Sequence, residues 1–298
     1  MKMKPPPPAI VFAVATLGIA VFSSMDAVMK GLSLAIGAYN AILWRSLAGT
    51  VITGGIFLAA RTPWPTRTVL RVHLLRGGIS AAMSILFFWG LARVPMAQAV
   101  ALTFVAPLAA LLLAALLLHE RIGRGTLIGS GVALAGIAII FAGQAHAAIG
   151  PEALLGSLAV LGSALCYAWN IILMRQQAQV ARPIEIAFFQ TAIVAAIFLA
   201  AAPVFATPPA AGHWPALVGA ALLATASLML LSWAYARGRA SDLAPSEYTA
   251  FVWASLLGWL VFSESLSPYT LGGAALIIAG CVAGLRARPN APILETSL

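Results

Sequence analysis

The chain alternates between long apolar runs and short polar connections. Each run is about 20 residues long, the length that an α-helix needs to cross the hydrocarbon core of a bilayer. The run from residue 186 to 236 has no Asp, Glu, Lys or Arg in 51 positions, and prolines in its middle divide it into two helices. The pattern therefore predicts ten membrane-spanning helices, over residues 9–30, 39–60, 70–91, 95–118, 124–143, 153–175, 184–203, 215–236, 244–262 and 267–285.

An internal repeat relates the two halves of the chain. Residues 89–136 match residues 233–280 without a gap after a shift of 144 positions, with 14 of 48 positions identical. The informative identities are Trp89/Trp233, Arg93/Arg237, Glu120/Glu264 and Thr126/Thr270. Each copy reads as an apolar helix, a turn with a glutamate, and a second apolar helix with paired glycines. We expect the two glutamates to be turn and cap residues, and the glycines to allow close helix packing.

Composition excludes most other classes of protein. The chain is 62% hydrophobic and 8% charged, so a water-soluble domain could not cover its surface with polar groups. The net charge of +9 does not indicate nucleic-acid binding, because the basic residues punctuate apolar runs rather than line a polar helix face. Cys166 and Cys281 lie mid-way along apolar runs without metal-ligand spacing and are expected to be buried. We expect no metal, no cofactor and no catalytic residue.

The basic residues predict the orientation in the membrane. Fourteen Lys and Arg residues fall on the side of the two termini, and only Lys30 and Arg93 fall on the other side. Both termini are therefore expected in the cytoplasm, in a multi-pass protein of the inner (plasma) membrane. An odd number of helices per half inserts the second half upside down, as in many secondary transporters. The predicted parts are a lead (1–8), a first five-helix half (9–143), an inverted second half (150–285) and a tail (286–298).

Two segments carry a resemblance to a known family. The segment VAPLAALLLAALLLHERIGRGTLIGSGVALAGIAII and its echo LLGWLVFSESLSPYTLGGAALIIAGCVAG resemble the drug/metabolite transporter superfamily, EamA-type branch. Within it the chain looks most similar to YddG-type exporters of aromatic and neutral amino acids. The resemblance implies a ten-helix bundle around a central cavity that works by alternating access. One departure is Phe251 in place of Pro107, which removes the reason for a kink in the helix over 244–262.

The helix over 153–175 carries the first candidate binding residues. Tyr167 and Asn170 share one of its faces, and the matching face of the helix over 9–30 presents Met25. A phenol, an amide and a thioether would suit a zwitterion with an apolar side chain. Packing alone would explain Phe22 and Met29 on the same face of the helix over 9–30. An unpartnered amide facing lipid, by contrast, costs several kcal/mol.

Glu247 is the carboxylate that lies deepest in an apolar run. It is a candidate for contact with a substrate ammonium or for proton coupling, because intramembrane acids usually face a pathway or a partner. Its counterpart in the repeat, Thr103, and its neighbour, Tyr248, complete this candidate group. The alternative is that the helix begins near Tyr248 and that Glu247 marks its first turn, where a carboxylate favours the helix dipole.

The remaining polar positions have alternative interpretations. Ser80 and Ser84, with Met83 beside them, are candidate site residues, although serines in membrane helices often serve packing or bond to the preceding turn. Arg45 lies mid-helix and must pair with something; a carbonyl or a neighbouring helix end is favoured over substrate. Two further expectations concern pairing and exposure: Asp26 with Lys30 one turn later, and Arg71, His73 and Arg76 reaching the membrane interface.

The sequence thus favours a secondary transporter that exports small metabolites, and among these it favours neutral or aromatic amino acids as the substrates. A multidrug exporter of lipophilic cations is the alternative, and it would need Glu247 or Asp26 as the cavity acid. A membrane-embedded enzyme is a third class, but the histidines are scattered at helix ends without paired carboxylates. The expected partners are a small-molecule substrate and lipid, without nucleic acid. The oligomeric state is left open, and a monomer is compatible with the pattern.

Overall fold

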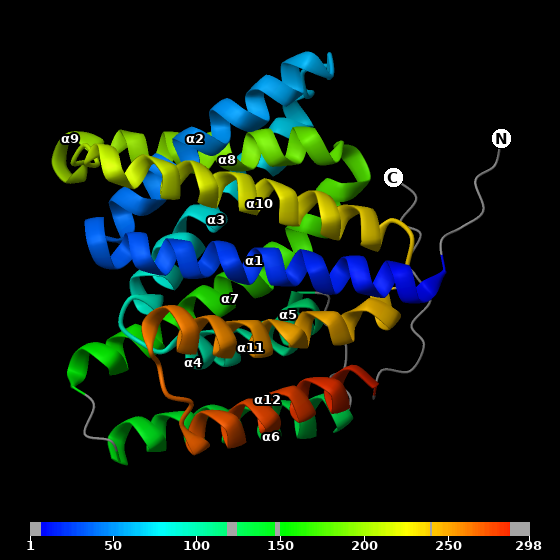
Figure 1. The fold of residues 1–298 in the computed structure, drawn as a ribbon. Coiled ribbons are helices and arrows are strands. Elements are labelled where there is room, and N and C mark those ends of the chain that lie inside the picture. The colour runs from blue at the N-terminus through cyan, green and yellow to red at the C-terminus, as the bar shows by residue number, and fades with distance from the viewer. Residues whose placement is uncertain (1–6, 118–123, 147–149, 239, 287–298) are drawn as a thin grey trace.

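The computed structural model describes residues 7–117, 124–146, 150–238 and 240–286, and over these residues the chain is helical, without a β-strand. The main helices run along one common direction, and α1 begins at the same end of the bundle at which α12 finishes (Figure 1). Six helices in these ranges are long and apolar enough to cross a membrane, and shorter apolar helices accompany them. The elements are α1 (Pro8–Ile36), α2 (Ala38–Ala59), α3 (Arg67–Leu91), α4 (Met96–Thr103), α5 (Ala106–Leu117), α6 (Arg124–His146), α7 (Pro151–Val180), α8 (Pro183–Ala200), α9 (Ala202–Phe205), the 3₁₀ turn η1 (Ala211–His213), α10 (Trp214–Tyr235), α11 (Ala240–Phe262) and α12 (Pro268–Arg286).

Backbone chemistry sets the ends of α1. It begins at Pro8, where a missing N–H has no consequence because the first turn has no carbonyl partner for it. It runs on to Ile36, six residues beyond the predicted end, and stops at Gly37. The φ of 79° at Gly37 is a conformation that glycine adopts without strain, and α2 begins at the next residue.

The helix predicted over 95–118 breaks into α4 and α5 just before Pro107. A proline has no N–H for the carbonyl four residues earlier, and its ring clashes with that carbonyl. The carbonyl of Phe104, at the break, accepts the thiol of Cys281 from α12 at 2.9 Å. The prediction that both cysteines are buried is confirmed for Cys281, whereas Cys166 is only half-buried. The helix α11, with Phe251 at the matching position, is continuous.

Antiparallel helix pairs form the frame of the bundle. The most extensive contacts join α6 to α12, α3 to α7, α1 to α10 and α2 to α8. Glycines permit the closest of these, since a Cβ on Gly136 would lie 2.5 Å from the carbonyl oxygen of Gly273, and one on Gly280 would lie 2.5 Å from that of Gly129. The expected role of these glycines in close packing is confirmed.

The two copies of the repeated Trp and Arg share a local structure. The guanidinium of Arg93 lies over the ring of Trp89 at 3.7 Å from its centroid, and that of Arg237 lies over Trp233 at 4.5 Å. Each arginine also donates to the carbonyl oxygen of its own tryptophan, one turn back. The identities in sequence therefore correspond to a repeated structural unit.

Polar and apolar side chains are distributed as in a membrane protein. Large apolar side chains cover the outside, among them Val51, Leu58 and Val204, which are 73–78% exposed. Charged groups such as Asp26 and Arg76 are buried instead. In water this arrangement would expose far more apolar surface than a soluble monomer carries, whereas lipid accommodates it.

Candidate functional site

Glu247 and three tyrosines form the centre of the candidate site. The hydroxyl of Tyr235, the last residue of α10, donates to Oε1 of Glu247 on α11 at 2.5 Å. Tyr167 on α7 and Tyr248 on α11 are close enough to interact electrostatically with the same carboxylate. Glu247 is exposed and the tyrosines are half-buried, so the carboxylate has an open side. Because α11 begins at Ala240, the alternative that Glu247 marks a first turn is wrong.

The break between α4 and α5 lies beside this centre. The ring of Phe104 packs edge-on against Tyr248, with 5.4 Å between centroids. Thr103, the preceding residue, donates from its hydroxyl to the carbonyl of Val100 at 2.7 Å and closes the last turn of α4. The ring contact of Phe104 with Tyr248 therefore places the interruption between α4 and α5 next to the polar centre.

Arg76 extends the site on the α3 side. It is 7% exposed, and its Nε donates to Oδ1 of the buried Asn170 on α7 at 3.0 Å. It also interacts electrostatically with Tyr167. The expectation that His73 and Arg76 reach the interface is wrong, because both are buried between α3, α7 and α8, whereas Arg71 is exposed.

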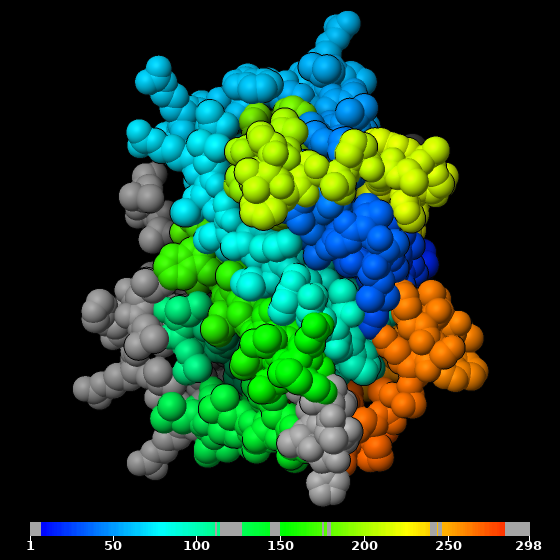
Figure 2. Space-filling model, turned by 90° about the vertical axis from the view of Figure 1, so that its left-hand side faces the viewer, coloured from blue at the N-terminus to red at the C-terminus, as the bar shows by residue number. Residues whose placement is uncertain are grey.

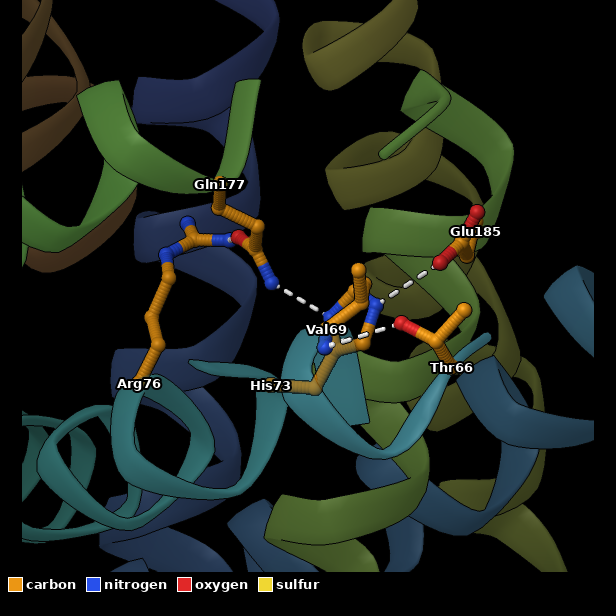
Figure 3. A network of polar contacts seen from close by, with 6 residues as sticks. All are labelled: Thr66, Val69, His73, Arg76, Gln177 and Glu185. Carbon is orange, nitrogen blue, oxygen red and sulfur yellow. Dashed lines mark hydrogen bonds and ion pairs between the residues drawn. The ribbon is translucent and has the colours of Figure 1, made fainter. Parts of the chain in front are cut away.

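A chain of hydrogen bonds continues from Arg76 (Figure 3). Nη1 of Arg76 donates to Oε1 of Gln177 at 2.5 Å, and Nε2 of Gln177 lies 2.5 Å from Nδ1 of His73. Nε2 of His73 lies 3.0 Å from Oε1 of Glu185 on α8. The imidazole also stacks on the ring of Phe189, with 4.7 Å between centroids. Three helices are thus joined by a buried polar network.

Asp26 and Arg45 form a separate buried group between α1 and α2. A guanidinium nitrogen of Arg45 lies 3.7 Å from the sulfur of Met25, and its carbon lies 5.8 Å from the ring centroid of Phe88. Asp26 interacts electrostatically with Arg45, but within the described part of the chain Oδ1 of Asp26 and Nε of Arg45 have no hydrogen-bond partner. The predicted Asp26–Lys30 pair is wrong, because Lys30 is bound elsewhere.

Lys30 connects three segments at the end of the bundle away from the start of α1. Its ammonium forms an ion pair with Glu264 and donates to the carbonyl of Val94 at 2.7 Å. Oε2 of Glu264 accepts the backbone N–H of Met96 at 2.7 Å, which caps the start of α4. Figure 2 views this end, where the blue end of α1 lies beside the segments before α4 and after α11. Glu264 is therefore a turn and cap residue as predicted, while Glu120 lies outside the described residues.

The candidate residues Ser80, Met83 and Ser84 all lie on α3. Ser80 is buried and its hydroxyl has no hydrogen-bond partner among the described residues. The carbonyl of Met83 accepts the hydroxyl of Ser163 on α7 at 3.0 Å, and Ser84 is half-buried. Of the nine predicted residues, Tyr167, Asn170, Glu247 and Tyr248 take part in these contacts. Thr103 bonds within its own helix and precedes Phe104, which packs on Tyr248. Among the described residues, no hydrogen bond, ion pair or ring contact joins Met25, Ser80, Met83 or Ser84 to this group.

Two grooves on the surface lie apart from this group. One, of about 520 Å³, lies between α4 and α11 beside Glu264, and another, of about 440 Å³, lies along the C-terminal half of α1. Their lining is mostly apolar and includes the exposed Trp259 and Val261, so lipid chains would fill them in a membrane. Among the residues that the structure describes, no group of three or more His, Cys, Asp and Glu lies close enough to hold a metal ion.

The sequence did not identify five residues of the site, because contacts between helices bring them there. They are His73, Arg76, Gln177, Glu185 and Tyr235. A signal existed for some of them. Arg76 and His73 lie one turn apart on one face of α3, and an arginine followed by 16 uncharged residues could be read as the start of a buried face.

Comparisons with known proteins find similarity to membrane transporters. The model of the EamA-like transporter family matches residues 9–142 and 154–285. The pseudopaline exporter CntI of Pseudomonas aeruginosa is 27% identical over 90% of this chain and 93% of its own. A riboflavin transporter of Rhizobium johnstonii is 32% identical over 74% and 70%, and a probable terminal-alkyne amino-acid exporter of Streptantibioticus cattleyicolor is 30% identical over 67% of each chain.

One crystal structure covers 96% of this chain and 98% of its own with a TM-score of 0.63, at 22% identity, which is a likeness of fold. The family match extends over most of the chain and agrees with its apolar helices. This protein is a multi-pass membrane transporter of the EamA-like family, within the drug/metabolite transporter superfamily.

Proposed function

We propose that the protein exports neutral or aromatic amino acids across the inner (plasma) membrane by alternating access. In this proposal ten spanning segments form two inverted halves, residues 9–143 and 150–285, with both termini in the cytoplasm. Flux is driven by an ion or substrate gradient. The observation that carries the proposal is the convergence of Glu247, Tyr235, Tyr167 and Arg76, from four helices, into one polar group.

Helix contacts support the inverted halves. A shift of 144 positions places α1 on α7 and α3 on α10, so the pair of α1 with α10 exchanges with the pair of α7 with α3. The same shift places α6 on α12 and α2 on α8, so each of these two pairs maps onto itself. The same shift turns the contact of Gly136 with Gly273 into that of Gly280 with Gly129. A pseudo-two-fold axis in the membrane plane would produce this set of contacts.

The polar groups at the two ends of the bundle support an inward-facing state. At the end where α1 finishes, Lys30 and Glu264 hold α1, the start of α4 and the segment after α11 together. The exposed Glu247 lies seven residues from the opposite end of its helix. With the termini in the cytoplasm, the site would be reached from inside and closed toward the outside.

The chemistry of the site supports a small zwitterion. A carboxylate can hold an ammonium, a guanidinium can hold a carboxylate, and three phenol rings can flank an apolar or aromatic side chain. One of the relatives is named as a probable terminal-alkyne amino-acid exporter, which is consistent with export of amino acids by this chain. The alternative of a lipophilic-cation exporter is favoured by the same Glu247 with its three aromatic neighbours, because acids and π-faces attract cations.

Counterflow into proteoliposomes tests the proposal. Vesicles with the pure protein, loaded with unlabelled substrate, would receive radiolabelled aromatic, branched, threonine or methionine substrates, and a lipophilic cation in parallel. We expect accelerated exchange of amino acids and not of the cation, while protein-free vesicles show neither. Exchange of the cation alone would establish the alternative.

A further inference from the structure

Arg76 carries a buried positive charge that the described residues do not neutralise. It lies in the third turn of α3 and is 7% exposed. Its two hydrogen-bond acceptors, Asn170 and Gln177, are neutral amides. In the ranges that the structure describes, no carboxylate oxygen lies within 4.0 Å of its guanidinium, although Lys30 and Arg93 each have such a partner. A cation taken out of water is costly without an anion or strong acceptors.

The network in Figure 3 explains why Glu185 does not neutralise Arg76. A guanidinium can only donate, so Gln177 accepts with Oε1 and its NH₂ group donates to Nδ1 of His73. His73 then carries its proton on Nε2, donates it to Glu185 and is neutral. The carboxylate is therefore separated from Arg76 by a neutral amide and a neutral imidazole.

The network instead holds Arg76 in position. A guanidinium has five N–H groups, and the contacts with Asn170 and Gln177 occupy one on Nε and one on Nη1. Within the described residues Nη2 donates to no acceptor. Asn170 and Gln177, two turns apart on α7, fix the plane of the guanidinium and leave its remaining edge for a further ligand.

Tyr167 connects Arg76 to the candidate site. Its hydroxyl group interacts electrostatically with both Arg76 and Glu247. A positive and a negative group thus interact with the same phenol, and each is hydrogen-bonded only to neutral partners among the described residues: amides for Arg76 and the hydroxyl of Tyr235 for Glu247. This is the charge arrangement that complements a zwitterion.

We propose that Arg76 binds the carboxylate of the transported molecule, while Glu247 faces its ammonium. The proposal rests on the function proposed above and narrows it to α-amino acids and similar zwitterions. Amines and amides, which have no carboxylate, would leave Arg76 without an anion and bind more weakly. The lipophilic cations of the alternative would be repelled by Arg76.

Binding measurements on the purified full-length protein test this. Aromatic, branched, threonine and methionine ligands would each be compared with their carboxamides, by the ligand-induced shift in melting temperature and by competition with a radiolabelled amino acid. The variants are Arg76→Gln, which removes the charge, and Arg76→Lys, which keeps it without the planar fork. Arg71→Gln is the matched control, because Arg71 lies on the same helix but is exposed.

We expect wild-type protein and R71Q to bind amino acids about 10- to 100-fold more tightly than their amides, the range for a charge-assisted contact. In R76Q the ratio should fall to about one, and in R76K it should lie between these values. Equal binding of an amino acid and its amide by the wild type would overturn the proposal, even if R76Q does not fold. A wild-type ratio retained in R76Q would overturn it as well. If the wild type bound no amino acid at all, the proposed function itself would fail.

Discussion

Replacing Gly273 by alanine should separate α6 from α12. A Cβ at this position would lie 2.6 Å from the carbonyl oxygen of Gly136 and 2.5 Å from Cγ1 of Ile140. Ordinary contact distances require the helices to move apart by roughly 0.5–1 Å, which forfeits about a quarter to a half of the dispersion energy of the atoms facing the gap. Gly272 is the matched control, because a Cβ there meets nothing within 4 Å.

The expected magnitude follows from the difference between the two variants. Both gain up to about 1 kcal/mol of helix propensity relative to glycine, so this contribution cancels. Overpacking costs about 1–3 kcal/mol, and G273A should be less stable than G272A by that amount. Gly280→Ala should behave like G273A, because its Cβ would lie 2.5 Å from the carbonyl of Gly129.

The assay is the unfolding of purified protein in mixed micelles, followed by circular dichroism against denaturing detergent. The concentration of denaturing detergent at the unfolding midpoint should be equal to or slightly higher than that of the wild type for G272A. For G273A it should be clearly lower. Equal stability of G272A and G273A would refute the reasoning, because the predicted clash would then have no energetic consequence.

Three further predictions concern polar groups. Lys30→Met should destabilise the fold by about 3–5 kcal/mol, because it leaves Glu264 without its cation. The double variant with Glu264→Gln should recover part of this stability in the same unfolding assay. A double variant no more stable than K30M would contradict the pairing. Glu247→Gln should abolish the pH dependence of flux between about pH 5.5 and 8 if this carboxylate couples transport to protons; unchanged pH dependence would remove that role. Cys281→Val should cost about 1–2 kcal/mol by leaving the Phe104 carbonyl unpaired, whereas Cys281→Ser should be near neutral, as melting temperatures would show.

Features that depend on local sequence could be predicted. Apolar runs placed the helices, because crossing a membrane requires length and hydrophobicity that single segments display. The glycines of α6 and α12 were identified because small residues in apolar helices have few other uses. The break before Pro107 could have been located as well, since proline acts through its own backbone.

Features that depend on tertiary contacts could not be predicted from the sequence. Lys30 has Asp26 one turn before it, and local spacing favoured that pair, but Glu264 reaches it from a segment 234 residues away. Arg76 and His73 resemble interfacial residues because Arg71 precedes them, yet α7 continues to Val180 and brings Gln177 beside them. Nothing in the sequence near α3 indicates that extension.

The claim on which the site and the transport cycle depend is that the second half crosses the membrane in the opposite direction to the first. Arg93 and Arg237 test it directly, because they match in the repeat and have the same local structure. Each would be replaced by cysteine after substitution of Cys166 and Cys281, and labelled with a membrane-impermeant thiol reagent on intact spheroplasts and on inverted vesicles.

The inverted arrangement predicts that R93C reacts from the outside and R237C only in inverted vesicles. Reaction of both cysteines from the same side would contradict it and, with it, the proposed transport by two opposed halves.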